Sequence, residues 1–384
     1  MRMCVCLSEH FICCQNLLCT YLQACIIGAR SRKVLFASTR NSYCCICARS
    51  STKNEPSHEH ICYKNWLKTP TAMEADIIVE GFKNSMSMHN LKYGYIIGDG
   101  DSSVMAQLTK AQPYGPEFTI TKIECSNHIL RNYLRRIRDI STKTKNPVWQ
   151  VPLSARRAIT VDRQLRLRSA VTSAMKYRAG QADLTLQQKI NELKKDIQNG
   201  PFHAFGDHSM CQERGYFCTG PKQDEDNIVP DLKVVGIWDE ILAARNIVAS
   251  HAASLIHNVS TNRAESFNSI ICKYVSGKRV NHCLRGGYNI RCDLSVINVN
   301  SDGRTQGIIH KSLTRHSPGK ICKQNILSKQ NSVSKRRKRR NQKHRIRRRK
   351  RLVMSGPDCH YGIFCVSLFY YRPYNELSLN KSYC

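Results

Sequence analysis

Acidic residues are scarce in this chain of 384 residues: Asp and Glu number 28 against 60 Lys and Arg, and the formal net charge is +32. Thirteen of the basic residues fall within Lys335–Arg351, which leaves +19 spread over the rest of the chain. An ordinary soluble protein with one basic tail would not keep that excess elsewhere. The charge balance therefore favours a polyanionic partner, most simply nucleic acid.

Long uninterrupted apolar runs are also missing. Residues 1–25 are apolar and hold six cysteines, but they show no clear helical or strand period. Glu9 and His10 break the apolar stretch early, and Gln15, Asn16 and Gln23 interrupt its second half. This pattern favours neither a signal peptide nor a membrane segment, so we expect no membrane partner. The segment differs in character from the rest of the chain.

Cysteine, in contrast, is abundant, with 20 residues. Disulfide scaffolds are typical of short secreted chains, whereas this chain is long and rich in lysine. Reduced thiols and bound zinc therefore fit the composition better. The C-x-x-C pair Cys44 and Cys47, followed by His60 and Cys62, offers four soft ligands at zinc-site spacing. The alternative is a set of free thiols beside a hairpin, and Cys45 leaves open which thiol would bind.

A second group of candidate zinc ligands follows in a loop rich in Gly and Pro. His208, Cys211 and Cys218 lie between two helical stretches, and three such residues could share one ion. The alternative interpretation is that they are polar loop residues beside a partly buried cysteine.

The central stretch runs from Tyr93 to Asn132. An apolar run, Tyr93–Ile97, predicts a buried strand, and Asp99 and Asp101 follow it before a helix that Ser102 can cap. Alternation over Phe118–Ile123 predicts a second strand. A carboxylate held at a sheet edge in this way is well placed for a metal or ligand, although Asp-Gly-Asp-Ser is also common in turns.

Helices surround this unit. Residues 72–85 predict an amphipathic helix with Met73, Ile77, Ile78 and Phe82 inward, and its acids are expected on a solvated face. The sequence predicts a helical insertion with one helix near 155–178 and another over 184–198, ending at Gly200-Pro201. Residues 232–250 predict one further helix. After it, Asn262, Glu265 and Asn268 recur every three residues, which places a polar stripe on one helix face and fits either an active site or a surface helix.

Basic side chains form two candidate nucleic-acid surfaces. One is the outer face of a helix that follows residue 125, and the other is the run near the C-terminus, which must be solvated or bound to a polyanion. The residues predicted to contact DNA are Arg131, Arg135, Arg136, Lys335, Arg336, Arg337, Lys338, Arg339, Arg340, Arg347, Arg348, Arg349, Lys350 and Arg351.

Several motifs together resemble the Mutator-like transposase domain of animal genomes. They are GDGDSS, a C-x-x-H element (Cys125, His128) with Asn132, TNRAESFN, NSYCCICARS, HICYKNW, AMEADIIVEGFK, GDHSMC and ICKYVSGKRVN, spread over about residues 26–362. The resemblance implies an α/β fold with an RNase H-like mixed sheet core, a helical insertion before the last acid, and Mg²⁺-dependent DNA transposition by a DDE triad. Asp99 matches the second acid, with Asp101 as the fallback, and Glu265 matches the third. Cys125, His128 and Asn132 are expected to support the core.

The first acid of the triad has no counterpart. No aspartate occurs before Asp76, and Glu9 is the only acid before Ile26. This departure from the family indicates a chain that is truncated or mis-joined at its N-terminus and that binds DNA without cutting it. The basic run Lys335–Arg351 fits a nuclear localisation patch and predicts the nucleus as its location. The alternatives are a non-catalytic nuclear nucleic-acid-binding protein derived from a transposable element, and a zinc-stabilised interaction module. DNA is the expected partner, with a homo-oligomer left open and no small-molecule substrate.

The domain boundaries predicted from these patterns are 1–25 (atypical), 26–71 (strand and Cys/His element), 72–150 (first part of the core), 151–231 (helical insertion), 232–300 (last part of the core, with the Glu265 helix), 301–362 (basic, disordered tail) and 363–384 (atypical).

Overall fold

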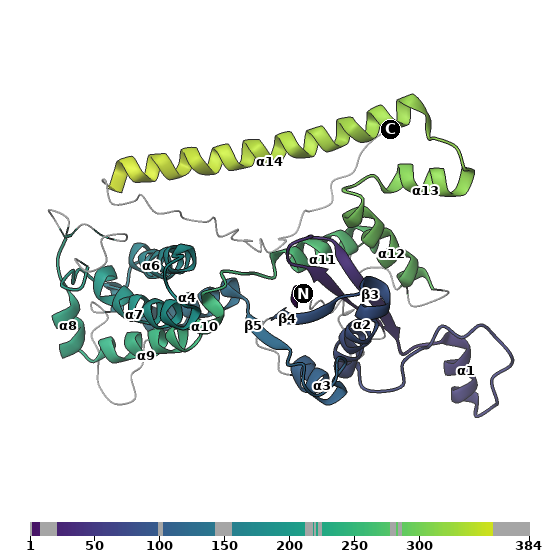
Figure 1. Cartoon of the computed structure of the whole chain (residues 1–384), viewed down its shortest axis with the longest axis horizontal. Helices are drawn as coiled ribbons and strands as arrows, with labels where there is room; N and C mark the ends of the chain where they lie inside the picture. Colours follow the sequence, from purple (N-terminus) through teal and green to yellow (C-terminus); the bar gives the residue numbers. More distant parts are fainter. Residues whose placement is uncertain are drawn as a thin grey trace, which may run out of the picture. The chain divides into compact units, whose positions relative to one another are not determined.

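The computed structural model describes residues 2–7, 21–98, 103–142, 156–211, 218, 220–221, 225–276, 282 and 286–355 (Figure 1). The chain divides into two compact units, Met1–Val333 and Ser334–Cys384. The first holds a mixed sheet, a group of packed helices and a Cys/His-rich segment. Helices predominate in it.

The sheet has five strands in the order β3-β2-β1-β4-β5. They are β1 (Arg2–Leu7), β2 (Tyr21–Gly28), β3 (Val34–Asn41), β4 (Lys92–Gly98) and β5 (Thr121–Glu124). The first three strands pair antiparallel, whereas β4 runs parallel to β1 and to β5. Cys6 pairs with Ile97, and Ile97 pairs in turn with Ile123. The predicted strands near 93–97 and 118–124 are therefore neighbours, as expected.

Helices cover both faces of this sheet. Ile26 and Ile96 pack on one face among residues of α2 (Met73–His89) and α3 (Ser103–Ala111). Ile27 and Ile97 pack on the other face among residues of α11 (Asn262–Tyr274) and α12 (Gly287–Asn300). Successive strand residues point to opposite faces, so neighbouring isoleucines enter separate cores. The α11 helix, which carries Glu265, thus lies beside the strands, as predicted.

The N-terminal stretch contributes two strands that its sequence pattern did not reveal. β1 occupies the centre of the sheet, and the predicted boundary at residue 25 falls inside β2. All eight residues of β2 are buried. A strand covered on both faces reads as a continuous apolar run without alternation, which explains why no strand period was visible.

Helix α2 follows its prediction, because Met73, Ile77, Ile78 and Phe82 are all 0% exposed. Its acids are not a free solvated face. The Arg40 guanidinium on β3 reaches Asp76 Oδ2 and Glu80 Oε2, each at 2.6 Å. Glu74 is buried, whereas the side chains of Asp76 and Glu80 are 41% and 40% exposed. The prediction of a solvated face missed this contact because β3 crosses this face of α2, and its Arg40 supplies the countercharge.

A separate hydrophobic cluster joins six helices. They are α4 (Ser126–Thr142), α6 (Val161–Gly180), α7 (Leu186–Ala204), α8 (Val229–Val234), α9 (Ile237–Ser250) and α10 (Ala252–Leu255). The predicted insertion, 151–231, divides this cluster, since α4 and α9 share its core. The single helix expected over 232–250 is split at Gly236, whose φ of 79° breaks the helical path. Helix α7 also continues past Gly200-Pro201 to Ala204.

The remaining elements are α1 (Cys45–Lys53), η1 (Pro70–Ala72), α13 (Thr305–Thr314) and α14 (Gly319–Ser355). The prediction of a disordered basic tail is wrong for residues 319–355, which form one helix. After Gly319 this segment holds no Gly or Pro and many good helix formers, so local propensity permits a helix although like charges repel. Among the described residues, no helix is long and apolar enough to cross a membrane.

The close contact between α2 and the sheet requires a residue without a side chain at position 81. A Cβ built there would lie 2.5 Å from Phe36 Cδ1 and 2.6 Å from Ile26 Cδ1. Gly81→Ala should therefore destabilise the protein by about 1–3 kcal/mol, even though alanine is the better helix former by about 1 kcal/mol. Denaturant unfolding measures the change.

The matched control is Gly180→Ala at the end of α6, where nothing lies within 4 Å of the added Cβ. It should leave the free energy of unfolding unchanged or slightly raised. Adding Phe36→Leu to Gly81→Ala should restore part of the loss. Equal stability of the two Gly→Ala variants would show that α2 does not approach the sheet this closely.

Candidate acidic site and metal centres

Cys125 connects three elements at the edge of the sheet. Its backbone N–H donates to the carbonyl of Gly98, at 2.9 Å, where β4 ends. Its Sγ accepts hydrogen bonds from the backbone N–H and the hydroxyl of Thr261, each at 3.3 Å, at the start of α11. The Cys125 side chain is 0% exposed. The ends of β4 and β5 therefore meet the first turn of α11 at one buried sulfur.

The first turn of α4 adds two further ties to the same place. The Ser126 N–H and hydroxyl both donate to the Val259 carbonyl, at 3.1 and 2.8 Å. The Asn127 side-chain amide donates to Asn262 Oδ1 at 2.8 Å. These bonds fix the start of α4 against the start of α11, so side chains on their first turns face one another.

Glu265 is the acid at this junction. Its Oε1 lies 3.4 Å from Arg131 Nη1 and 3.9 Å from His128 Nε2, both on α4. The Glu265 side chain is 46% exposed and that of Arg131 is 52% exposed. An exposed pair of this kind contributes about 0–1 kcal/mol to stability. The arrangement therefore leaves the carboxylate accessible to a cation or a ligand.

A second arginine lies near this pair. Burial lowers the pKa of Arg168 on α6, and repulsion from Arg131 lowers it further. Two neighbouring cations favour an anionic ligand that would relieve their repulsion. The α4 side of the junction is thus positively charged.

The other two predicted acids, Asp99 and Asp101, lie outside the described residues, which resume at Ser103 after Gly98. The predicted approach of Asp99 to Glu265 accordingly stays a prediction. Of the supporting motif, Cys125 is buried and His128 is partly buried, and hydrogen bonding between their side chains helps to lower the pKa of the thiol. Asn132 is exposed on α4.

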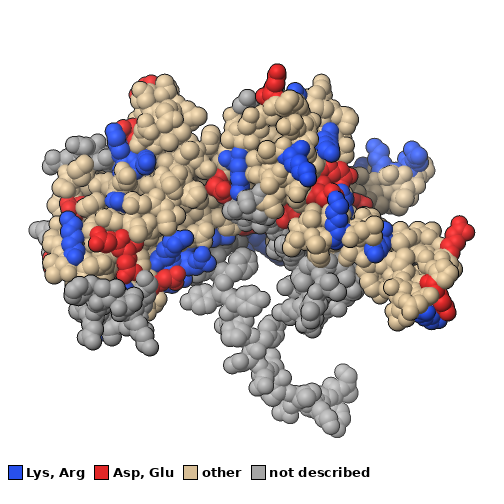
Figure 2. All heavy atoms as spheres, turned by 90° about the horizontal axis from the view of Figure 1, so that it is seen from below, with Lys and Arg blue, Asp and Glu red and all other residues tan. Residues whose placement is uncertain are grey.

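The predicted basic surfaces are accessible where they are described. Arg131, Arg135, Arg136 and Arg138 are all exposed on α4, while Ile129, Leu130, Tyr133 and Ile137 are buried. Figure 2 shows Lys and Arg at several places on the visible face, interspersed with Asp and Glu. On α14, Lys335, Arg336, Lys338 and Arg339 are exposed. The side chains of Arg337, Arg340, Arg347, Arg348, Arg349, Lys350 and Arg351 lie outside the described part.

The first Cys/His group comes together as predicted. The ligand atoms of Cys44, Cys47, His60 and Cys62 all lie within 4.8 Å of one another. Cys44 Sγ and Cys47 Sγ each lie 3.4 Å from His60 Nε2, and the sulfurs of Cys47 and Cys62 are 3.7 Å apart. Tetrahedral bonds of about 2.0–2.3 Å imply edges of about 3.3–3.8 Å between ligand atoms. The four residues could therefore hold a metal such as zinc.

Local hydrogen bonds prepare these side chains for metal binding. The His60 Nδ1–H donates to the His58 carbonyl at 2.8 Å, so the lone pair of Nε2 is the one that can bind a metal ion. Burial would raise the pKa of Cys44, but bonds to its sulfur from the N–H groups of Cys47 and Ile46 outweigh burial and lower it to about 6. Cys45 is not in the group, which answers the question of which thiol takes part.

The second group has a member that the sequence did not predict. His203 joins His208, Cys211 and Cys218, with all ligand atoms within 4.8 Å of one another. His203 lies in the last turn of α7 and therefore did not look like part of the loop. The spacing His203-x4-His208, just before Cys211, was the available signal.

Comparison with known proteins agrees with these motifs. The model of the Mutator-like transposase family matches residues 19–218. The chain therefore belongs to the Mutator-like transposase family. The matched range includes β2, both Cys/His groups and Cys125, and it ends before Glu265. Searches of curated proteins and of solved structures give no match.

The buried Cys125 thiol generates a pH prediction. Burial raises its pKa, but bonds from His128 and Thr261 outweigh burial and lower it to about 7 from its ordinary value of 9.0. Between those pH values the unfolded thiol keeps its proton and the folded one loses it, so stability rises with pH across this window. Relative to Cys125→Ala, the wild type should gain about 1–2 kcal/mol between pH 6 and pH 8.5.

Denaturant unfolding of wild type and Cys125→Ala at pH 6 and pH 8.5 measures this gain. The other titrating groups are the same in both proteins, so their contributions cancel in the difference between the two free energies of unfolding. The control is Cys272→Ser, on the far part of α11, whose difference from wild type should not change with pH. A wild-type advantage that is the same at both pH values would show that Cys125 stays protonated.

Proposed function

We propose that this chain is a DNA-binding Mutator-like transposase whose catalytic triad is incomplete. The observation that carries the proposal is the junction at Cys125, which brings the end of β4 and the Glu265 helix together in a chain of this family. Asp99 directly follows Gly98 in the sequence. Glu265 thus lies in one of the elements that meet at this buried sulfur, and Asp99 follows the last residue of another in the sequence.

An RNase H-like core is the fold that we propose for the sheet and its helices. Support comes from the strand order β3-β2-β1-β4-β5, in which three antiparallel strands are extended by two parallel ones. Helices on both faces, and a helical group between β5 and α11, agree with the insertion expected before the last acid.

Strand alternation supports Asp99 as the second acid. Ile97 packs on the sheet face that α11 covers, together with Ile123 and Phe267. Residues two apart on a strand point to the same face. Asp99 lies two residues after Ile97 in the sequence, so the prediction that it approaches Glu265 agrees with this alternation. Two neighbouring carboxylates would suit Mg²⁺, which prefers oxygen ligands and, when bound, would activate the attacking oxygen and stabilise the leaving one.

The first acid is the missing part. The resemblance leads us to expect it on a strand upstream of Ile26, and β1, which precedes Ile26 and pairs with β4, has the sequence RMCVCL, which contains no carboxylate. Two acids do not supply the ligands that two ions need for an in-line displacement. We therefore propose that the chain binds DNA and does not cut it.

DNA binding is supported by the exposed arginines of α4 beside Glu265 and by the basic run of α14. Both would act through phosphates, so binding is expected to tolerate sequence changes. The same basic run, Lys335–Arg351, fits a nuclear localisation patch, and we propose the nucleus as the site of action. Zinc is proposed as the ion for Cys44, Cys47, His60 and Cys62, since three thiolates and one imidazole form a common structural zinc site.

A second candidate function is a nucleic-acid-binding protein that retains the family fold without catalysis. The observation that favours it is again the absence of a carboxylate in the β1 sequence. The two proposals differ in what they predict for a variant with an acid in β1. The first predicts that this variant cuts DNA, and the second predicts that it does not.

The catalytic part of the proposal is tested with supercoiled plasmid and Mg²⁺. The wild type should nick no more than the Asp99→Ala/Glu265→Ala variant. Cys6→Asp places an acid at the β1 position in register with Ile97, two residues before Asp99, and should produce nicking that Glu265→Ala abolishes. Wild-type nicking above the control would contradict the incomplete triad. A silent Cys6→Asp variant would favour the second function.

The binding part is tested by fluorescence anisotropy of duplex DNA at several salt concentrations. Each lost phosphate contact lowers the log–log slope by about 0.9. Lys335→Gln/Arg336→Gln and Arg135→Gln/Arg136→Gln should therefore each flatten the slope by about 1.8. The matched control is Lys194→Gln/Lys233→Gln, which removes two exposed charges elsewhere. Equal slopes for all variants would remove these surfaces from the binding site.

The first metal centre is tested by Cys47→Ser, which should lose zinc from that site and destabilise the segment around α1. Inductively coupled plasma mass spectrometry measures the zinc, and Cys45→Ser is the matched control because Cys45 lies outside the group. Retention of zinc by Cys47→Ser together with loss by Cys45→Ser would overturn the ligand assignment.

A further inference from the structure

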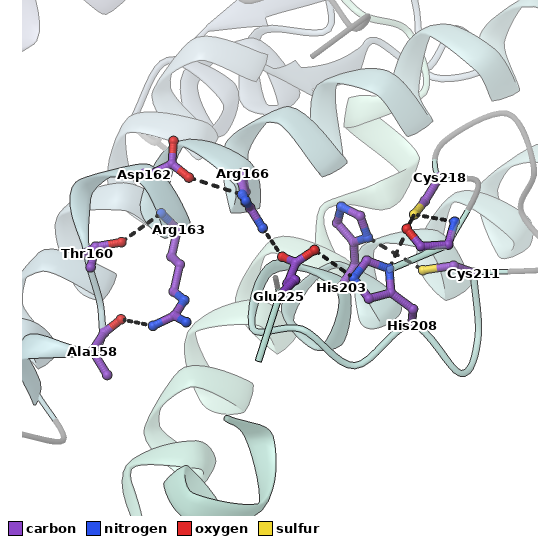
Figure 3. Close-up of polar contacts among 11 residues, drawn as sticks. Ala158, Thr160, Asp162, Arg163, Arg166, His203, His208, Cys211, Cys218 and Glu225 are labelled. Carbon is purple, nitrogen blue, oxygen red and sulfur yellow. Dashed lines mark hydrogen bonds and ion pairs between the residues drawn. The ribbon is translucent and has the colours of Figure 1, made fainter. Parts of the chain in front are cut away.

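The segment that links α7 to α8 gathers four soft ligands and a buried ion pair (Figure 3). His203 comes from the last turn of α7, and His208, Cys211 and Cys218 follow in the connection. Glu225 returns from the far end of the same connection, just before α8 begins at Val229. These residues lie outside the junction at Cys125, and the proposed transposase function makes no use of them.

The distances between ligand atoms match one tetrahedral ion. Cys211 Sγ lies 3.5 Å from His203 Nδ1, and Cys218 Sγ lies 3.3 Å from His208 Nδ1. Both values fall in the range of about 3.3–3.8 Å expected for the edges of a zinc tetrahedron. The two imidazole rings lie edge to face, with centroids 4.8 Å apart. Each ring therefore presents its Nδ1 to a sulfur, as Figure 3 shows.

His208 has a dedicated partner on its other nitrogen. Its Nε2 lies 3.2 Å from Glu225 Oε2, so the carboxylate can accept that N–H while Nδ1 is left to bind metal. A carboxylate on the second nitrogen fixes the tautomer of a metal-binding histidine and strengthens it as a ligand. The side chains of His208 and Glu225 are 6% and 12% exposed. The pair therefore lies largely inside the protein, which distinguishes it from an exposed surface contact.

The Glu225 carboxylate is held in turn by another helix. Its Oε1 is ion-paired with Arg166 of α6, and Arg166 Nε also donates to Asp162 Oδ2 at 3.1 Å. A largely buried carboxylate is costly unless it is paired and hydrogen-bonded. Glu225 satisfies one oxygen with arginine and the other with histidine. The line Asp162–Arg166–Glu225–His208 thus runs from α6 into the ligand group.

The backbone of the connection is also adapted to bring its two ends together. Gly206 has a φ of 92°, and a Cβ there would collide with the Asp226 carbonyl. The Ile228 N–H donates to the Phe205 carbonyl at 3.1 Å, with Phe205 fully buried. Only glycine fits at position 206, which lies between His203 and His208, so the segment folds back on itself there.

We infer that His203, His208, Cys211 and Cys218 form a structural Cys₂His₂ zinc centre, and that Glu225, held by Arg166, orients His208 within it. Two thiolates and two imidazoles in a tetrahedron suit zinc among the common divalent ions. The centre closes the long connection between α7 and α8 and ties it to α6. Its metal affinity therefore depends on a helix that contributes no ligand.

The centre is tested on the full chain by zinc content under reducing conditions. The wild type should carry one zinc for each of the two groups. Cys44→Ser/Cys47→Ser should keep the second zinc, Cys211→Ser/Cys218→Ser should keep the first, and the four-fold variant should carry none. The matched control, Cys272→Ser/Cys322→Ser, removes two cysteines outside both groups and should keep both zincs.

Cobalt absorption then identifies the ligands. In the Cys44→Ser/Cys47→Ser background, Co²⁺ should give tetrahedral bands with thiolate charge transfer, and His203→Ala should change them. A Cys44→Ser/Cys47→Ser protein that binds no metal would overturn the centre. A Cys211–Cys218 disulfide in the freshly purified wild type, detected by mass spectrometry without reductant, would overturn it too.

The role of Glu225 has its own readout. Glu225→Gln keeps an acceptor for His208 but loses the charge that pairs with Arg166, and it should weaken zinc binding about 10–100-fold in competition with a chelator. Glu240→Gln, which neutralises an acid elsewhere in the helical group, should leave the affinity unchanged. Equal affinity of Glu225→Gln and wild type, with unchanged helical circular dichroism, would remove Glu225 from the centre.

Discussion

The Cys125 sulfur is the contact on which the arrangement of the acidic site depends. The backbone N–H of the same residue continues the β4–β5 pairing past Glu124 by donating to Gly98, and its thiol accepts two bonds from Thr261. Sulfur is large and weakly hydrated, so it can be fully buried and still accept hydrogen bonds. A serine hydroxyl would be shorter and more costly to desolvate at this position. One atom therefore sets the spacing between the sheet edge and α11.

The sequence predicted best those features that are local. The inward face of α2, the outward arginines of α4 and the group around Cys44 each follow from spacing along one helix or one loop. Such patterns are visible because neighbouring residues share an environment that depends on helical geometry alone. The pairing of β4 with β5 was also predictable, since a strand, a helix and a second strand in succession favour adjacent parallel strands.

The missed features depend on contacts between distant segments. β2 is buried on both faces, so it shows no period, and its burial requires α2 and α11 together. Arg40 meets Asp76 across a helix–sheet contact that no sequence window contains. His203 belongs to a helix by its local pattern and to a ligand group by its position in space. Likewise, α4 and α9 lie far apart in the sequence and share one hydrophobic core, which only their packing reveals.

The two Cys/His groups serve segments with little apolar material of their own. The first lies in a region in which α1 buries no residue, and the second lies in a connection that leaves the helical group and returns to it. A metal ion replaces a hydrophobic core where too few apolar residues are available to form one. In both groups a histidine is oriented by an acceptor outside the ligand set, a backbone carbonyl in one and a carboxylate in the other.

The density of positive charge along helix α14 determines how the helix interacts with small ions. Lys335–Arg351 spans about 26 Å at about 1.5 Å per residue. Its thirteen cationic side chains therefore succeed one another every ~2 Å along the axis, close to the ~1.7 Å between phosphate charges along duplex DNA. A rod of that charge density collects small anions around itself, as DNA collects cations. In the proposed complex with DNA, both ion atmospheres would be released, so the entropy of mobile ions from the helix would add to that from the nucleic acid.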